Sequence, residues 1–412
     1  MGKNLVVGLD IGTSSIKVAV IENRNNQSEV KLMFKEPSLG LRRGAIVDLT
    51  ECSQAVGKSL AKIRNGFKSG VKNIYVNAGS SQIRAQKSKG VVAVSRADNE
   101  IYRDDIDRVV RASQAISLEP NRSIIHTITR EYTIDGVGGI ADPLGLSGSR
   151  LEVNSLVIDA FTPHIKNLIK VIDLVGGSVG DLLFTPLAAS RSVLSKVQKD
   201  LGVVLVDIGF GTTGLSVYEE NRILGVASFP VGAGNITNDL AIGLKIPVEA
   251  AEKIKLNYGY ALAKEVGLKE SIELEKIYPE GKGVVSRRFV AEVIEARMVE
   301  IFEFINNELK LMGKAGDFAG GVVFVGGGAK LPGLTELSRR ELKLFSQIGF
   351  TNNDNRLVVP PAFGDLVDDP EFVNSIGLAL FGGERNSWRP GTAIGSTGVV
   401  GKIKKIFNYF TP

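Results

Sequence analysis

Short runs of consecutive apolar residues recur along the chain, and each ends at a polar or glycine-rich turn. Leu5–Leu9 leads into Asp10, Leu201–Val206 leads into Asp207, and Gly321–Val325 leads into Gly326. Runs of this length between turn residues are typical of strands buried on both faces, in sheets that carry helices on either side. The pattern therefore predicts an α/β protein.

The first two of these strands are each followed by a Gly/Ser/Thr turn and a second apolar run. The turn at Gly12–Ser15 precedes Ile16–Ile21, and the turn at Gly209–Gly214 precedes Leu215–Tyr218. Turns without bulky side chains expose consecutive backbone N–H groups, which a phosphate can approach closely. A single turn of this kind is often an ordinary one. Its recurrence after a second buried strand favours two phosphate-binding hairpins.

Side chains around both turns fit the same chemistry. Asp10 and Asp207, at the strand ends, suit Mg²⁺, which prefers hard oxygen ligands and keeps most of its waters. Lys17 could place a positive charge near the phosphates. Hydroxyl donors are available from Thr13, Ser14, Thr212 and Thr213.

A third glycine cluster follows the strand at Gly321–Val325. Gly326–Gly328 would let a flat ring or a ribose approach the backbone, and a helix is expected from about Thr335. The alternative is a tight strand-to-helix turn.

Composition limits the remaining classes. The 412 residues contain one cysteine (Cys52) and two histidines (His126 and His164), which argues against a disulfide scaffold, a Cys/His metal site or a His-centred relay. A net charge of +5 does not by itself indicate nucleic acid, and none is expected as a partner. No signal peptide and no apolar stretch of about 20 residues is evident, so a reducing compartment is expected.

Together, the two hairpins and the glycine cluster resemble the actin, Hsp70 and sugar-kinase superfamily. The resemblance implies a duplicated actin-like (ribonuclease H-like) two-lobe ATPase fold, with ATP and Mg²⁺ in the cleft and Asp10 and Asp207 holding the metal through water. It assigns these residues to ATP: Gly12, Thr13, Ser14, Ser15, Lys17, Gly209, Phe210, Gly211, Thr212, Thr213, Gly232, Glu252, Lys255, Gly326, Gly327, Gly328 and Ala329. For Glu252 and Lys255 the alternative is a solvated i, i+3 pair.

Further segments resemble one family within this superfamily, the bacterial cell-division proteins called FtsA. They are Gly40–Asp48, Asp142–Glu152, Thr185–Ser190, Ala251–Gly259 and Ile294–Ile301. Membership would imply an actin-like ATP-binding protein that polymerises head to tail. It would anchor FtsZ filaments on the cytoplasmic face of the cell membrane at the division septum.

The same resemblance implies a domain organisation. A small α+β subdomain, 1C, would be inserted in the first lobe at 84–160 and would contact other division proteins. A helical insertion, 2B, would occupy 226–301 of the second lobe. The lobe 1 core would comprise 1–83, 161–190 and about 363–382, and the lobe 2 core would comprise 191–225 and 302–362. The FtsZ tail is expected at Arg287, Arg288, Arg297 and Glu300.

Hydrolysis is expected to be slow. Hydrolysing relatives position the attacking water with a Gln or Glu, and Thr185 occupies the matching position here. A threonine hydroxyl is a weak base with a short reach, so no catalytic residue is assigned.

The end of the chain changes in character. Residues 383–398 are rich in Gly, Ser and Pro, which predicts a flexible linker. In 399–412 the apolar residues fall on one helical face, as expected of an amphipathic helix that lies on an anionic membrane. The alternative is a helix docked on the protein's own body. The membrane-binding residues would be Val399, Lys402, Ile403, Lys404, Lys405, Ile406, Phe407 and Phe410.

Two other functions remain open at this point. One is a pilus-assembly ATPase of the PilM type, which shares the loops but is generally shorter and lacks this tail. The other is a small-metabolite kinase, which would need an acidic base besides the two aspartates. A chaperone would need a substrate domain after the ATPase, and only a linker and a short helix follow.

Overall fold

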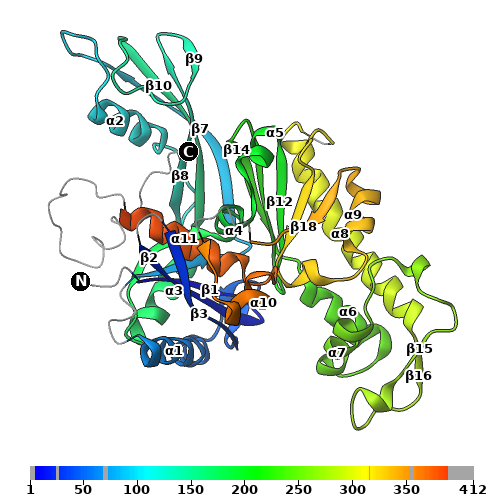
Figure 1. Ribbon diagram of the computed structural model, residues 1–412. Coiled ribbons are helices and arrows are strands. Elements are labelled where there is room, and N and C mark those ends of the chain that lie inside the picture. Colours follow the sequence, from blue (N-terminus) through cyan, green and yellow to red (C-terminus); the bar gives the residue numbers. More distant parts are fainter. Residues whose placement is uncertain (1–4, 25–26, 68–72, 315, 352–356, 388–412) are drawn as a thin grey trace.

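The computed structural model describes residues 5–24, 27–67, 73–314, 316–351 and 357–387. Figure 1 shows two sheets side by side, with one subdomain projecting from each. Within the described ranges, no helix combines the length and the apolar character that crossing a membrane requires.

The first lobe is built on a six-stranded sheet. Strand β1 pairs antiparallel with β2 and parallel with β6. In spatial order the strands are β11 (Val179–Phe184), β6 (Ile74–Ala78), β1 (Leu5–Ile11), β2 (Ser15–Arg24), β3 (Gln27–Pro37) and β19 (Leu357–Val358). A small hairpin, β4 (Leu41–Arg42) and β5 (Ala45–Ile46), lies beside this sheet.

The second lobe repeats the arrangement with five strands. Their order is β14 (Arg222–Phe229), β13 (Thr213–Glu219), β12 (Val203–Ile208), β17 (Val322–Val325) and β18 (Ser346–Ile348). The strand before Asp207 begins at Val203, two residues later than expected. Leu201 instead ends helix α5 (Lys196–Leu201) and is exposed.

Helices cover both faces of each sheet, which explains the unbroken apolar runs. In β12, Val203 and Leu205 face one core, whereas Val204 and Val206 face another. Helices α4 (Thr185–Val193) and α11 (Val373–Ser387) contribute to the core shared by the two lobes. On the outer faces lie α1 (Leu49–Gly66) and α3 (Thr162–Leu174) in lobe 1, and α8 (Arg287–Leu311) and α9 (Leu334–Leu342) in lobe 2.

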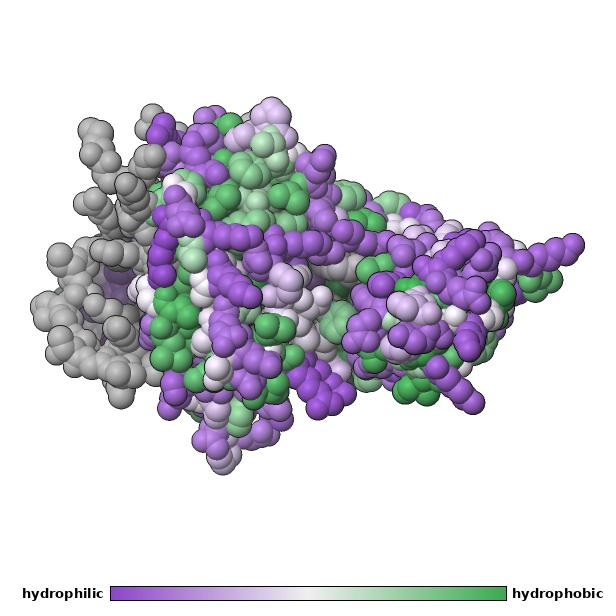
Figure 2. Space-filling model, turned by 90° about the horizontal axis from the view of Figure 1, so that it is seen from below, coloured by the Kyte–Doolittle hydropathy of each residue, from purple (hydrophilic) through white to green (hydrophobic). Residues whose placement is uncertain are grey.

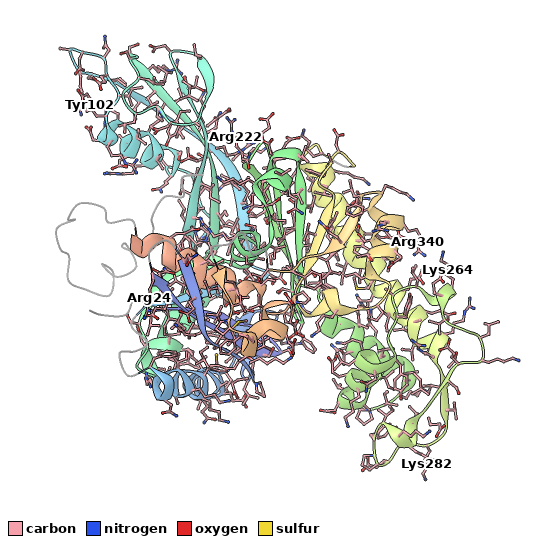
Figure 3. All side chains as sticks on the ribbon, viewed as in Figure 1. Arg24, Tyr102, Arg222, Lys264, Lys282 and Arg340 are labelled. Atoms are coloured by element: carbon pink, nitrogen blue, oxygen red, sulfur yellow. The ribbon has the colours of Figure 1, made fainter. Side chains whose placement is uncertain are left out.

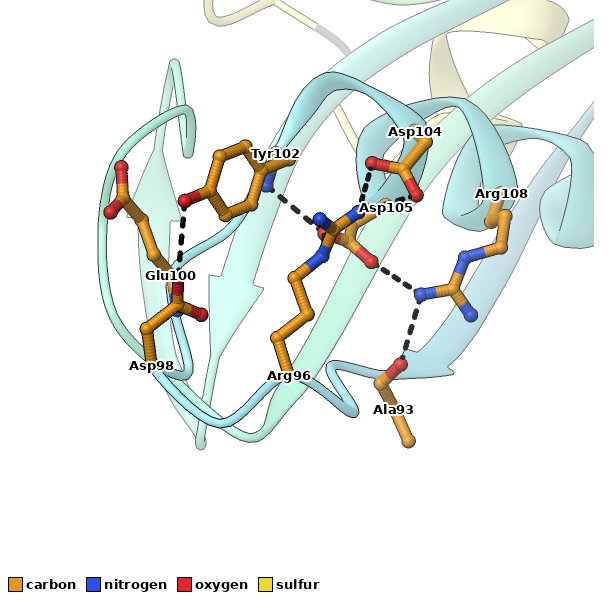
Figure 4. Close-up of polar contacts among 8 residues, drawn as sticks. All are labelled: Ala93, Arg96, Asp98, Glu100, Tyr102, Asp104, Asp105 and Arg108. Carbon is orange, nitrogen blue, oxygen red and sulfur yellow. Dashed lines mark hydrogen bonds and ion pairs between the residues drawn. The ribbon is translucent and has the colours of Figure 1, made fainter.

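The first-lobe insertion is a four-stranded sheet with one helix, as the α+β expectation required. Its elements are β7 (Ile83–Ala93), α2 (Arg103–Ser113), β8 (Arg122–Ile134), β9 (Val137–Ile140) and β10 (Arg150–Phe161). At its far end Arg96 pairs with Asp104 and stacks on the Tyr102 ring, whose hydroxyl donates to Asp98 (Figure 4). Arg222 of β14 pairs with Glu131 of the insertion and lies where the insertion approaches lobe 2 (Figure 3).

The second-lobe insertion is mainly helical. It contains α6 (Ala233–Leu244), α7 (Val248–Tyr258), the short turns η1 (Ala263–Glu265) and η2 (Leu274–Lys276), the pair β15 (Ser271–Glu273) and β16 (Val284–Ser286), and the start of α8. Figure 2 shows small hydrophobic patches interspersed with hydrophilic side chains on the face seen from below.

Several predicted boundaries need correction. Helix α8 runs across 301, β14 runs across 225, and β19 pairs with β3 of lobe 1 although 302–362 was assigned to lobe 2. Helix α11 continues to Ser387, so the predicted linker does not begin at 383. The Gly and Ser content of this stretch therefore did not show where the helix ends, because the end of a helix also depends on its packing. The rest of the linker and the predicted membrane helix at 399–412 lie outside the described residues.

Candidate functional site

A cavity of about 300 Å³ opens where the turns after β1 and β12 meet. Ligand pockets start at about this size. Its walls also include η3 (Gly327–Lys330), part of α7 and the start of α4. The predicted ATP-binding residues that line it are Gly12, Thr13, Ser14, Ser15, Lys17, Gly209, Phe210, Gly211, Thr212, Glu252, Lys255, Gly326, Gly327 and Gly328.

Three predicted ATP-binding residues are not in the cavity wall. Thr213 is buried, and its hydroxyl donates to the Val231 carbonyl at 2.8 Å. Ala329 packs in the lobe 2 core. Gly232 begins helix α6, and a Cβ there would lie 2.5 Å from the Gly209 carbonyl oxygen. These positions support the site from behind, which the sequence motif alone could not distinguish from lining it.

The two hairpins approach each other closely across the lobes. A Cβ on Gly211 would lie 2.7 Å from Oγ1 of Thr13. The Thr13 hydroxyl accepts from the Gly44 N–H at 3.0 Å, and the Thr212 hydroxyl donates to the Gly79 carbonyl at 3.2 Å. One of the expected phosphate donors, Thr212, thus joins the two lobes, whereas the hydrogen bond of Thr13 lies within the first lobe.

Asp10 and Asp207 face the same cavity and are both buried. Burial raises the pKa of Asp10 to about 6, against the opposing charge of Lys17, whose Nζ lies 3.8 Å from its carboxylate. Burial also raises the pKa of Asp207, although a hydrogen bond from Asn374 opposes the rise. Two buried carboxylates with one nearby lysine fit a hydrated Mg²⁺, which is typically held by one or two carboxylates plus phosphates. Among the described residues, no group of three or more His, Cys, Asp or Glu side chains could enclose a metal.

Thr185 lies at the start of α4 and lines the cavity. Its hydroxyl donates to the Ala78 carbonyl at 3.2 Å, and the preceding Phe184 N–H donates to Nε2 of His126 at 3.0 Å. The segment is therefore fixed by hydrogen bonds from two other strands. A hydroxyl already engaged as a donor to the backbone is poorly suited to activate water.

Glu252 and Lys255 are not a solvated pair. Lys255 is buried, and its Nζ donates to Glu252, to the Thr237 hydroxyl and to the Ala233 carbonyl at 2.7, 2.8 and 3.1 Å. Burial lowers the pKa of Lys255, and Glu252 opposes that change. The ammonium also lies 5.2 Å from the centre of the Phe210 ring, so α7 is tied to the turn of the second hairpin.

Sequence reasoning missed Asn77, Glu371 and Asn374 in the cavity wall. Asn77 accepts from the Ile11 N–H at 2.8 Å, and Asn374 donates to Asp207 at 3.0 Å. Glu371 pairs with Lys330 at 3.3 Å and with Lys35 at 3.4 Å. The cleft thus does contain acidic groups besides the two aspartates, although the Glu371 carboxylate is occupied by two lysines. The sequence signal that could have identified such a cavity residue is a polar residue within an otherwise apolar helix, as at Asn374.

The four residues expected to bind the FtsZ tail all lie on α8, but not together. Arg297 pairs in a bidentate manner with Asp239, at 2.6 and 2.9 Å, and also contacts Glu300. Arg287, about 15 Å away along the helix, pairs with Glu270. Arg288 is nine residues from Arg297, which places the two on opposite sides of an α-helix; its partner is Glu292.

Two facing lobes with matched hairpins define an actin-like two-lobe protein. Comparison with solved structures agrees, at sequence identities that speak to the fold alone. The structure resembles the PilM-PilN type IV pilus biogenesis complex, with a TM-score of 0.66, 17% identity and coverage of 92% of this chain and 98% of that one. It also resembles MreB5 of Spiroplasma citri bound to ADP, with a TM-score of 0.53, 12% identity and coverage of 92% and 96%.

The family follows from sequence comparison. Residues 204–377 match the family "Cell division protein FtsA", and residues 80–159 match "SHS2 domain inserted in FTSA". The chain is 34% identical to the cell division protein FtsA of Bacillus subtilis, over 92% of this chain and 83% of that protein. It is 32% identical to that of Pseudomonas aeruginosa, over 93% and 90% respectively. The chain therefore belongs to the FtsA family of cell-division proteins, as the sequence resemblance indicated, and PilM is a relative in fold only.

Proposed function

We propose that this protein binds ATP and Mg²⁺ between its lobes, polymerises at the cytoplasmic membrane and anchors FtsZ filaments there during division. The observation that carries the nucleotide part is the convergence of both hairpins and both aspartates on one cavity. The backbone of Gly12, Gly209 and Gly326–Gly328, which lines the cavity, would receive the phosphates and ribose. Lys17 would supply positive charge, and Asp10 and Asp207 would hold the hydrated cation.

ATP would act mainly as a conformational ligand. Contacts already join the lobes at Thr212 and Glu371, so a bound triphosphate between the same elements would bias their separation. With Thr185 as the residue nearest in role to a catalytic amide, turnover would be far below the usual enzyme range of about 1–10³ s⁻¹.

The proposed nucleotide site is tested by calorimetry with ATP in Mg²⁺ and in EDTA. Replacing Asp207 by Ala removes one of the two carboxylates and should abolish Mg²⁺-dependent binding while circular dichroism shows a folded protein. Lys35→Met, on the surface of the first lobe, serves as the control. Unchanged ATP affinity in folded Asp207→Ala would refute the assignment of the cleft.

The proposed membrane tether rests on the sequence of 399–412. Three lysines near an anionic surface contribute about 1 kcal/mol each, so one helix binds weakly and a polymer binds through many. Co-sedimentation with vesicles should be lost in a chain that ends at Ser387, a cut that leaves α11 whole. Phe407→Glu should fail to bind at any salt concentration. Gln at Lys402, Lys404 and Lys405 should remove only the preference for anionic lipid.

The proposed FtsZ-tail contact is tested on α8 with two matched arginines. Arg297→Glu should weaken binding of an FtsZ tail peptide without changing ATP affinity, whereas Arg288→Glu alters the same charge on the opposite side of the helix. Since Arg297 also holds Asp239, the melting temperature of each variant is measured in parallel. An unchanged peptide affinity in Arg297→Glu would remove Arg297 from the site.

A further inference from the structure

Asn374 is a polar residue in an apolar position. It lies in the first turn of α11 and is only 5% exposed, next to Phe372, Val373 and Ile376, which are fully buried. A buried amide costs about 1–3 kcal/mol for each hydrogen-bonding group left unsatisfied. A leucine of similar volume would avoid that cost, so the amide calls for an explanation in what it contacts.

The amide nitrogen of Asn374 donates to one of the two buried carboxylates. Its Nδ2 lies 3.0 Å from Oδ2 of Asp207, and the Asn374 side chain also lowers the pKa of Asp10, against the larger effect of burial. Asp10 lies near the end of β1 in lobe 1, and Asp207 lies in β12 of lobe 2. A side chain of lobe 1 thus holds the carboxylate of lobe 2 beside that of Asp10.

The amide oxygen of Asn374 is unused. Its Oδ1 is buried and has no hydrogen-bond partner among the described residues, although the side chain lines the cavity. Asn77, the other asparagine in the wall, differs in this respect because its Oδ1 accepts from the Ile11 N–H. The unpartnered acceptor of Asn374 therefore lies beside the two carboxylates at the place where a hydrated cation would supply donors.

We propose that Asn374 is the third residue of the cation site, where Nδ2 orients the Asp207 carboxylate and Oδ1 accepts a hydrogen bond from a water on the cation. The inference rests on the proposed Mg²⁺–nucleotide function and deepens it. A residue that orients metal ligands typically changes metal affinity 10- to 100-fold when it is removed. Since Asn374 belongs to α11 of lobe 1, the cation would be held jointly by both lobes.

The test compares ATP affinity in Mg²⁺ with ATP affinity in EDTA, by calorimetry on the full chain. In Asn374→Ala the gain in affinity that Mg²⁺ provides should fall at least 10-fold, while the affinity in EDTA stays within about twofold of the parent. The control is Ser375→Ala, which removes a buried hydroxyl from the same turn; that hydroxyl bonds only to the Phe372 carbonyl. A purely structural role would lower both affinities together and would overturn the proposal.

A second variant keeps the test decisive if Asn374→Ala does not fold. Asn374→Asp preserves the shape but replaces the donor with a third carboxylate. Mg²⁺ without nucleotide should then raise its melting temperature clearly more than that of the parent or of Ser375→Ala; an equal rise would place residue 374 away from the cation. Failure of the proposed function looks different, because the parent itself would then show no Mg²⁺-dependent binding of ATP.

Discussion

The two hairpins share a backbone but differ in their side chains. In each, the glycine two residues after the aspartate donates to the carbonyl three residues further on: Gly12 to Ser15 at 3.2 Å and Gly209 to Thr212 at 2.9 Å. The aspartates occupy the same register, yet Asp10 pairs with Lys17 across the strands and Asp207 pairs with Gly214. A Cβ on Gly214 would lie 2.7 Å from the Pro186 ring.

Because of this difference, the two hairpins present different side chains to the cavity. The first hairpin keeps a lysine and an exposed Ser14 beside the cavity. The second directs its hydroxyls into the protein, with Thr212 bonded to Gly79 and Thr213 to Val231. The duplicated backbone would thus provide two of the proposed phosphate contacts, and of the two hairpin turns the first has Lys17 beside the cavity. The second hairpin packs against α4.

The largest effect is expected from Asp10→Asn, in opposite directions for binding and stability. The rise of its pKa from 3.8 to about 6, in which burial outweighs the opposing charge of Lys17, means that the folded protein disfavours the ionised carboxylate by about 3 kcal/mol. At pH 7.5 the group is ionised, so a neutral amide of the same shape should raise the unfolding free energy of the nucleotide-free protein by about 1–3 kcal/mol. Chemical denaturation measures this, and calorimetry should show that Mg²⁺-dependent ATP binding is lost. A destabilised variant would mean that Lys17 outweighs burial.

Removing Lys17 should break the asymmetry of the hairpins. Hydrogen bonds to charged groups contribute about 1.5–3 kcal/mol, so Lys17→Met should weaken ATP binding about 10- to 150-fold. Lys35→Met, with its side chain half exposed on the next strand, should change it by less than about fivefold. Fluorescence titration with a labelled ATP analogue distinguishes the two. Similar losses in both variants would indicate a diffuse electrostatic effect.

Gly214→Ala tests whether the second hairpin has room for a side chain. The added methyl would press on Pro186, next to Thr185, and overpacking of this kind costs about 1–3 kcal/mol. The melting temperature should fall. Gly66→Ala, which meets nothing within 4 Å at the end of α1, should leave it unchanged or raise it slightly. An unaffected Gly214→Ala protein would show that α4 yields easily.

The smallest effect distinguishes a matched pair of hydroxyls at the same position of the two turns, Ser15 and Thr212. Ser15→Ala should lower ATP affinity by about 2- to 10-fold and leave stability unchanged, since it removes one neutral donor. Thr212→Val should mainly lower stability, by about 1 kcal/mol, because its hydroxyl joins the lobes at Gly79. Paired denaturation and binding curves measure both. Exchanged outcomes would reverse the roles assigned to the two turns.

The hairpins and the glycine cluster could be predicted because each depends on local sequence, whereas the insertions were predicted from the resemblance to the FtsA family. Buried strands, turn glycines and strand-end aspartates are all read within about ten residues of the chain. The lining of the cavity by Lys255 and by most of the glycines agreed with the family pattern for the same reason.

The features of the site that could not be predicted from the sequence depend on contacts between distant segments of the chain. Asn374 and Glu371 reach the cavity because α11 crosses between the lobes, more than 160 residues after Asp207 in the chain. Thr213 looks equivalent to Thr212 in the motif, and only the position of Val231 shows that it faces inward. Opposite faces of α8 likewise separate Arg288 from Arg297, although both look alike in a charged helix.

Helix α11 and its neighbours approach each other very closely at three glycines. A Cβ on Gly8 would lie 2.0 Å from the Ser375 carbonyl oxygen, one on Gly377 would lie 1.9 Å from that of Ala188, and one on Gly382 would meet the Tyr75 ring at 2.3 Å. Backbone thus rests on backbone or ring along about 11 Å of helix. Such close packing would resist sliding of the helix along its neighbours. A force applied to the chain beyond Ser387 would therefore be transmitted through α11 to Asn374 and the cleft. Tension at the end of the chain and occupancy of the cleft would then be mechanically linked.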